Sequence, residues 1–204
     1  MNMARPTDGP RMDPLLVDAA SVAPQPWRNG GGQTRELLAW PAAGDWMLRI
    51  SRADIVADGP FSAFPGVERW FCVLHGDGVA LGFPDAQRQL RVGDAPLRFA
   101  GQAAPSCRLL GGATHDLNLM ARHGLATMRL WQSGQAWDEP FAMRGLYTTR
   151  AGRWSDGMGS RSVGADSLLW WHEAVPTAWT FTPADPAGGP VCWLGYTPHR
   201  VVRR

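Results

Sequence analysis

The chain has 204 residues, of which 45% are apolar, and its formal net charge at pH 7 is +2. An apolar fraction of this size supports one or two packed domains and excludes a disordered chain. Because the charge is close to zero, no overall field would draw the protein to nucleic acid or to an anionic membrane, and we expect neither as a direct partner. All 20 basic residues are arginines, which excludes Schiff-base chemistry on lysine and favours bidentate recognition of anions.

The cysteines and the N-terminal residues bear on the compartment. Cys72, Cys107 and Cys192 are far apart in the sequence and form no Cys-x-x-Cys motif. An odd number of isolated cysteines is typical of buried thiols in a reducing environment. The N-terminus has no apolar leader, and no apolar run approaches the roughly 20 residues that span a bilayer. The sequence therefore predicts a soluble, cytoplasmic protein.

Short apolar or alternating stretches recur along the chain. They cover residues 45–55, 69–83, 89–101, 106–112 and 116–122, and then residues 125–134, 145–154, 167–174, 178–183 and 191–199. Gly, Pro and Asp clusters separate them, and we expect loops at residues 61–70 and 182–190. This pattern predicts an all-β protein with two β-rich halves, residues 1–122 and 123–204. The adjacent Trp170 and Trp171 are interpreted as one ring on each side of a strand.

A glycine-rich stretch, PWRNGGGQTREL, occupies residues 26–37. Its three glycines could bring backbone N–H groups close to a ligand in an anion-binding concavity, with Asn29 and Thr34 beside them. A β-bulge or a plain turn into the sheet explains the glycines equally well. Trp27 is expected in the core.

Two arginines are candidates for anion binding. In LRISRA, residues 48–53, strand alternation places Arg49 and Ser51 on one face and Ile50 on the other. An inward Arg49 needs an anion, which is either a ligand or a buried Asp or Glu. Arg69 follows an FPG turn, which places its guanidinium at the mouth of a barrel or on the surface against loop carbonyls.

The stretch DLNLM adds polar and apolar candidates on one strand face. Asp116, Asn118 and Met120 share that face, and Arg122 continues it. Asn118 is suited to read a polar edge of a ligand or to form a structural bond across the barrel, and Met120 is suited to an apolar wall.

Several catalytic chemistries lack their residues. The sequence has no His-x-His pair, and its histidines are isolated, at His75, His115, His123, His172 and His199. We therefore expect no bound metal and no other cofactor. No Gly-x-Ser-x-Gly elbow or phosphate-binding loop is present, and the acidic residues show no spacing that demands acid–base roles.

Five segments together resemble one known family. PWRNGGGQTREL, WMLRISRADIVADGPFSAFPGVERW, LHGDGVAL, PLRFAGQ and LLGGATHDLNLMAR are similar, in order and spacing, to the HutD/Ves family of bicupins over residues 26–122. The resemblance implies two packed jelly-roll-like β-barrel modules and no established catalytic activity. It also implies a small-molecule-binding regulator in members tied to histidine-utilisation operons, whereas other members are associated with stress. Where the family has a second Arg after Arg122, this chain has His123.

These observations favour a metal-free protein that binds and senses a small carboxylate, with urocanate and N-formylglutamate as the ligands that the resemblance suggests. A metal-independent isomerase or hydrolase acting on a related acid is one alternative. A protein-interaction module with a vestigial pocket is another, and a homodimer is expected from open sheet edges. The predicted ligand-binding residues are Asn29, Thr34, Arg49, Ser51, Arg69, Asn118, Met120 and Arg122.

Overall fold

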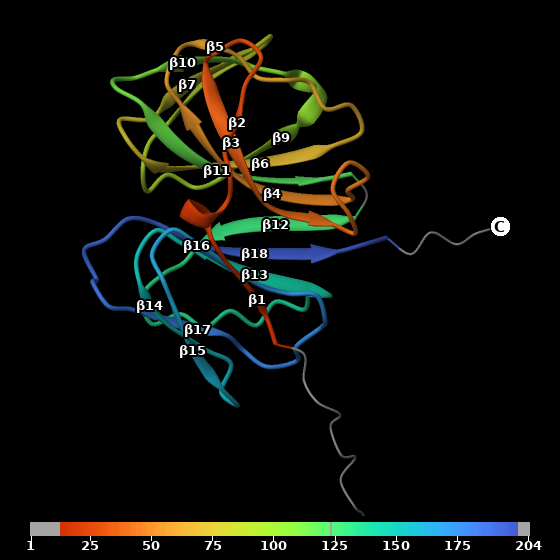
Figure 1. Cartoon of the computed structure of the whole chain (residues 1–204), viewed down its shortest axis with the longest axis vertical. Coiled ribbons are helices and arrows are strands. Elements are labelled where there is room, and N and C mark those ends of the chain that lie inside the picture. The colour runs from red at the N-terminus through yellow and green to blue at the C-terminus, as the bar shows by residue number, and fades with distance from the viewer. Residues whose placement is uncertain (1–12, 123, 200–204) are drawn as a thin grey trace, which may run out of the picture.

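The computed structural model describes residues 13–122 and 124–199. Its strands form two modules, one above the other, and Figure 1 shows the N-terminal strands mainly in the upper module. Two short 3-10 helices, Ala19–Ser21 and Gly101–Ala103, interrupt the strands. The prediction of an all-β protein with two jelly-roll-like modules is confirmed.

The N-terminal module consists of two antiparallel sheets. The six-stranded sheet has the order β2-β3-β4-β11-β6-β9, formed by Gln25–Pro26, Gly32–Trp40, Leu48–Ile55, Thr114–Ala121, Glu68–His75 and Leu97–Ala100. The four-stranded sheet has the order β5-β10-β7-β8, formed by Gly59–Pro60, Ser106–Leu109, Val79–Phe83 and Ala86–Leu90. Apolar residues of the two sheets, among them Ile55, Phe71 and Leu81, pack together in one core.

The C-terminal module also has two antiparallel sheets. The five-stranded sheet has the order β1-β16-β13-β18-β12, formed by Leu15–Asp18, Ser167–Trp171, Met143–Thr148, Val191–Thr197 and Leu125–Leu130. The three-stranded sheet has the order β15-β14-β17, formed by Ser160–Val163, Gly152–Ser155 and Thr180–Pro183. Trp170 belongs to the core between the modules and Trp171 to the core within this module, which confirms the prediction for the pair.

Strand β1 crosses from one half of the sequence to the other. Leu15 pairs with Trp170 and Asp18 with Ser167, so β1 forms an edge of the C-terminal module's larger sheet. A division of the chain at residue 122 therefore separates β1 from the sheet that it completes.

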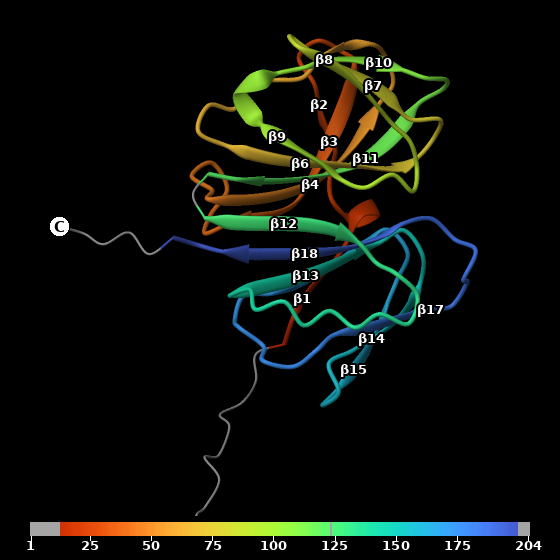
Figure 2. The same cartoon turned by 180° about the vertical axis from the view of Figure 1, so that it is seen from behind.

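The six-stranded and five-stranded sheets share a large apolar core where the modules meet, and Figure 2 shows their stacking from behind. Leu48 and Leu119 from one sheet and Leu194 from the other are fully buried there. Because strand neighbours point to opposite faces, this packing directs the alternate residues of β4 and β11 into the N-terminal module. In the described part of the chain, no helix is long and apolar enough to cross a bilayer.

Candidate functional site

A cavity of about 520 Å³ lies in the N-terminal module. Its size is within the range of small-molecule sites. The lining comes from β2 and the loop after it, from β3, β4, β6 and β11, and from β5 and the loop after it. It comprises Gln25, Pro26, Trp27, Arg28, Asn29, Thr34, Arg49, Ser51, Ala53, Pro60, Phe61, Ser62, Phe64, Arg69, Asn118 and Met120.

Seven of the eight residues proposed from the sequence line this cavity, namely Asn29, Thr34, Arg49, Ser51, Arg69, Asn118 and Met120. Strand alternation accounts for most of the convergence. In β4, Leu48 and Ile50 enter the core between the modules while Arg49 and Ser51 face the cavity. In β11, Leu117 and Leu119 face that core while Asn118 and Met120 face the cavity.

Arg49 has a protein carboxylate as a partner. Its Nε donates a hydrogen bond to Oε2 of Glu36 at 2.6 Å, so the ion pair with an Asp or Glu, one of the two alternatives that the sequence left open, is present. Glu36 lies on β3 opposite Ser51, and no spacing in the sequence marks it as the partner of Arg49. Within the described residues, the two terminal nitrogens of Arg49 form no hydrogen bond, so they can still donate to a ligand.

Arg69 is buried, with only 6% of its surface exposed. Its Nε donates to Oδ1 of Asn118 at 2.8 Å, and its guanidinium carbon lies 4.3 Å from the centre of the Phe61 ring. Burial, helped by the nearby charge of Arg49, lowers the pKa of Arg69 to about 10, which leaves it charged at neutral pH. Its terminal nitrogens also form no hydrogen bond within the described part of the chain.

Asn118 connects Arg69 to a buried acid. The side-chain nitrogen of Asn118 donates to Oδ1 of Asp116 at 2.5 Å. Asp116 is 1% exposed, and burial raises its pKa to about 7. The structural bond that the sequence offered as one role for Asn118 is therefore present, beside a position on the cavity wall.

Arg122, the eighth predicted residue, does not line the cavity. Strand β11 ends at Ala121, and the backbone N–H of Arg122 donates to the carbonyl of Met47. Its Nη1 lies 3.3 Å from Asp45 Oδ1, and its guanidinium carbon lies 5.0 Å from the Trp46 ring centre. The alternation of the strand thus stops one residue too early to direct Arg122 inward. His123 lies outside the described residues.

The glycine-rich stretch forms a turn and a close packing contact, not an anion-binding concavity. The N–H of Gly30 donates to the carbonyl of Trp27 at 3.0 Å, and the N–H of Gly31 donates to Oδ1 of Asn29 at 3.0 Å. Gly30 has φ +71°, which disfavours other residues, and a Cβ at Gly32 would collide with the carbonyl oxygen of Asp54. The bulge of this region lies further on, where the register of β3 shifts between Glu36 and Leu38.

The sequence reasoning missed much of the apolar wall. Phe61 and Phe64 line the cavity from the loop before β6, and their place in an aromatic loop next to Arg69 was the signal that could have indicated them. Trp27 packs against the module's core and also lines the cavity, with its Nε1 donating to Oγ1 of Thr34 at 2.7 Å. Arg28, exposed beside it, adds a third cation.

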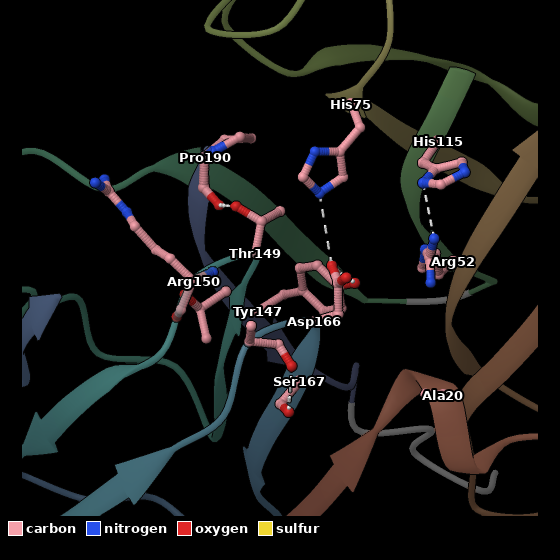
Figure 3. A network of polar contacts seen from close by, with 12 residues as sticks. Ala20, Arg52, His75, His115, Tyr147, Thr149, Arg150, Asp166, Ser167 and Pro190 are labelled. Atoms are coloured by element: carbon pink, nitrogen blue, oxygen red, sulfur yellow. Dashed lines mark hydrogen bonds and ion pairs between the residues drawn. The ribbon is translucent and has the colours of Figure 1, made fainter. Parts of the chain in front are cut away.

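Two histidines lie outside the cavity, where the modules meet (Figure 3). His75 Nε2 is 3.7 Å from Oδ1 of Asp166 in the C-terminal module, and Arg52 Nη2 donates to His115 Nδ1 at 2.7 Å. Burial, followed by the charge of Arg52, lowers the pKa of His115. The first contact connects the two modules, and the second connects β4 to β11 within the N-terminal module.

Cupins often hold a metal, but the donors here do not fit one. The cavity lining contains no His, Cys, Asp or Glu. In the parts of the chain that the structure describes, no three such side chains come together where they could hold an ion. Three or more such ligands are the usual requirement.

The fold resembles solved structures across the chain. The structure of HutD from Pseudomonas fluorescens SBW25 matches with a TM-score of 0.78 and 24% identity over 91% of this chain and 98% of that one. A mutant of Bacillus subtilis oxalate decarboxylase matches with a TM-score of 0.60 and 8% identity over 96% of this chain and 80% of that one. Two packed β-modules of this kind define the bicupin fold.

The chain belongs to the HutD family, whose model matches residues 19–176. Protein Ves from Citrobacter koseri is 32% identical over 179 residues, which are 86% of this chain and 93% of that protein. A 21.2 kDa protein from the hutC 3′ region of Pseudomonas putida is 42% identical over 109 residues, 52% of this chain and 56% of that protein.

Proposed function

We propose that this protein binds a small organic acid in the cavity of its N-terminal module, without a metal, and acts as a sensor of that acid in histidine utilisation. The observation that carries the proposal is the presence of Arg49 and Arg69 on one cavity, each with its Nε bonded to the protein and its terminal nitrogens not hydrogen-bonded within the described residues.

The chemistry of the cavity supports a carboxylate. A guanidinium presents parallel N–H donors that match the two oxygens of a carboxylate, and such charge-assisted bonds are roughly twice as strong as neutral ones. Because Arg69 is almost fully buried, a bound anion would offset its desolvation. Phe61, Phe64 and Met120 offer an apolar wall for the carbon skeleton of the acid.

The candidate acids follow from the family resemblance. The P. putida relative is described by its place in the hutC 3′ region, and the family resemblance suggests urocanate or N-formylglutamate. Both are small carboxylates, and we propose them as the first ligands to test.

A binding role agrees better with the cavity than either alternative. An isomerase or hydrolase without a metal needs a proton donor or acceptor beside its substrate, and the lining contains no His, Cys, Asp or Glu. A vestigial pocket would be closed by side chains, whereas this one retains about 520 Å³.

Titration calorimetry with urocanate and N-formylglutamate tests the proposal. We expect at least one acid to bind to the wild type, and Arg49→Lys to weaken it about tenfold or more, since an ammonium cannot reproduce two parallel bonds. Arg122→Lys is the matched control, because Arg122 lies outside the cavity, and it should leave the affinity unchanged.

Thermal unfolding without ligand separates the two roles of Arg49. If Arg49 serves only its ion pair with Glu36, the lysine variant will lose stability but keep the affinity of the wild type. That result, or the failure of both acids to bind, would reject the proposal.

A further inference from the structure

Asp116 is a buried acid directly behind the cavity wall. It lies on β11, on the face that also carries Asn118, and 1% of its surface is exposed. It is not itself part of the lining. Its connection to the cavity is a chain of two hydrogen bonds, in which Arg69 donates to Asn118 and Asn118 donates to Asp116.

The carboxyl group of Asp116 is poorly solvated by the protein. Oδ1 accepts one hydrogen bond, from Asn118, at 2.5 Å. Oδ2 is buried and has no hydrogen-bond partner among the described residues. An ionised carboxylate has room for about four hydrogen bonds, so the charged form is costly at this position.

Titratable groups on three other strands lie near Asp116, and those on two of them are charged. Arg69 on β6 favours the ionised form most, and Arg52 on β4 favours it less. Asp54, also on β4, opposes ionisation but is itself paired with arginines. Cys107 on β10 stays neutral, because burial raises the pKa of its thiol to about 12.

The balance of these effects leaves Asp116 close to its midpoint at neutral pH. Burial raises its pKa to about 7, and the charge of Arg69 and the bond from Asn118 offset only part of that rise. Any new negative charge beside Arg69 will therefore shift the balance toward the protonated acid.

We propose that binding of an anion in the cavity is coupled to proton uptake by Asp116. The inference rests on the proposed function, since it requires an anion at Arg69. The proton comes from the buffer and forms an O–H bond on the Asp116 carboxyl, and no other bond of the protein is broken. The proton taken up thus offsets part of the negative charge that the ligand brings to the cavity.

The coupling makes the protein respond to pH and to the acid together. Below neutral pH, Asp116 is already protonated, and Arg69 has its full charge available for the ligand. Above neutral pH, the ionised Asp116 competes with the ligand for that charge. If binding raises the pKa of Asp116 by about one unit, the affinity will fall about tenfold between pH 6 and pH 8.5.

Calorimetry of the whole protein in two buffers tests this directly. The probe is N-formylglutamate, whose carboxyl groups do not titrate near neutral pH. In phosphate and in Tris at pH 7.5, the apparent heats should differ by the difference between the two buffers' ionisation heats multiplied by the number of protons taken up. A one-unit rise from a pKa of about 7 corresponds to about half a proton per ligand at this pH. Asp116→Asn should abolish that difference and make the affinity independent of pH between 6 and 8.5.

Asp45→Asn is the matched control, since Asp45 is exposed and pairs with Arg122 outside the cavity, and it should take up protons like the wild type. Equal heats in the two buffers for a wild type that binds would overturn the coupling and leave the proposed function intact. Failure of the wild type to bind would reject both. Should Asp116→Asn fail to fold, the comparison of wild-type heats in the two buffers still decides whether binding takes up protons. A ¹³C carboxyl titration with and without the probe then shows whether binding raises the pKa of a buried carboxyl group.

Discussion

The two modules are both built from paired antiparallel sheets, but they use their interiors in opposite ways. The N-terminal module retains a cavity of about 520 Å³, lined by arginines and small polar groups. The C-terminal module packs its interior with indole rings, from Trp137, Trp154, Trp171, Trp179 and Trp193. The ring centres of Trp154 lie 4.4 Å from Trp171 and 5.1 Å from Trp179. One interior is suited to a ligand and the other to stability.

A buried arginine in each module shows the same contrast. Arg144, 2% exposed, donates to the backbone carbonyls of Val175 and Thr177, and its guanidinium carbon lies 4.6 Å from the Trp179 ring centre. Among the described residues, Arg69 uses one donor, its Nε, in a hydrogen bond to Asn118. The first guanidinium holds a loop to a sheet, whereas the second has donors left for an anion.

The largest effect is expected from the indole cluster. Trp179 is fully buried, so Trp179→Ala should lower the free energy of unfolding by about 3–5 kcal/mol in chemical denaturation. Trp27→Ala, in the cavity wall, should cost much less stability because Trp27 is only partly buried, but it should weaken acid binding. Equal losses of unfolding free energy in the two variants would show that an indole contributes as much to stability in the N-terminal module as in the C-terminal module.

The second effect is a pH dependence of stability confined to the N-terminal module. The pKa of Asp116 rises from 3.8 in the unfolded chain to about 7 when folded, chiefly through burial. The folded state then binds more protons than the unfolded state between pH 4 and 7, so Asp116 lowers stability as pH rises through that range. The loss is on the order of 4 kcal/mol at most.

Asp116→Asn should remove this loss, since it cannot ionise. Denaturation at pH 4.5 and pH 8 should show that the free energy of unfolding of the wild type falls relative to that of Asp116→Asn as the pH rises. A parallel pH dependence in the two proteins would mean that Asp116 ionises normally in the folded state.

Strand faces could be predicted from the sequence because alternation is local. Arg49 and Asn118 reach the cavity because Ile50 and Leu119, one position away, enter the core between the modules. The same rule failed at Arg122, because nothing in the alternation marks where β11 ends.

Pairing between distant segments could not be predicted. The short strand β1 joins β16, about 150 residues away, and its sequence carries no mark of that partner. Glu36 as the partner of Arg49 depends on the register of β3, which a bulge shifts. The titration of Asp116 depends on complete burial, a property of the packed module that spacing does not contain.

The smallest effect concerns the support of the cavity wall. Thr34 accepts the hydrogen bond from Trp27 Nε1 at 2.7 Å, and Thr34→Val keeps the shape of the side chain but removes the acceptor. We expect a loss of about 0.5–1.5 kcal/mol in the free energy of unfolding, measured by denaturation. Since the indole would then be less fixed against the cavity, acid binding should weaken by a few-fold at most.

Thr180→Val provides the matched change on an exposed strand position of the C-terminal module, and its effect on stability should stay within about 0.5 kcal/mol. The two measurements on Thr34→Val separate two roles of Trp27. A loss of stability together with affinity means that the indole forms part of the binding surface, as the cavity lining indicates. A loss of stability alone means that Trp27 packs against the core, and the N-terminal module would then resemble the C-terminal module more closely than the cavity suggests.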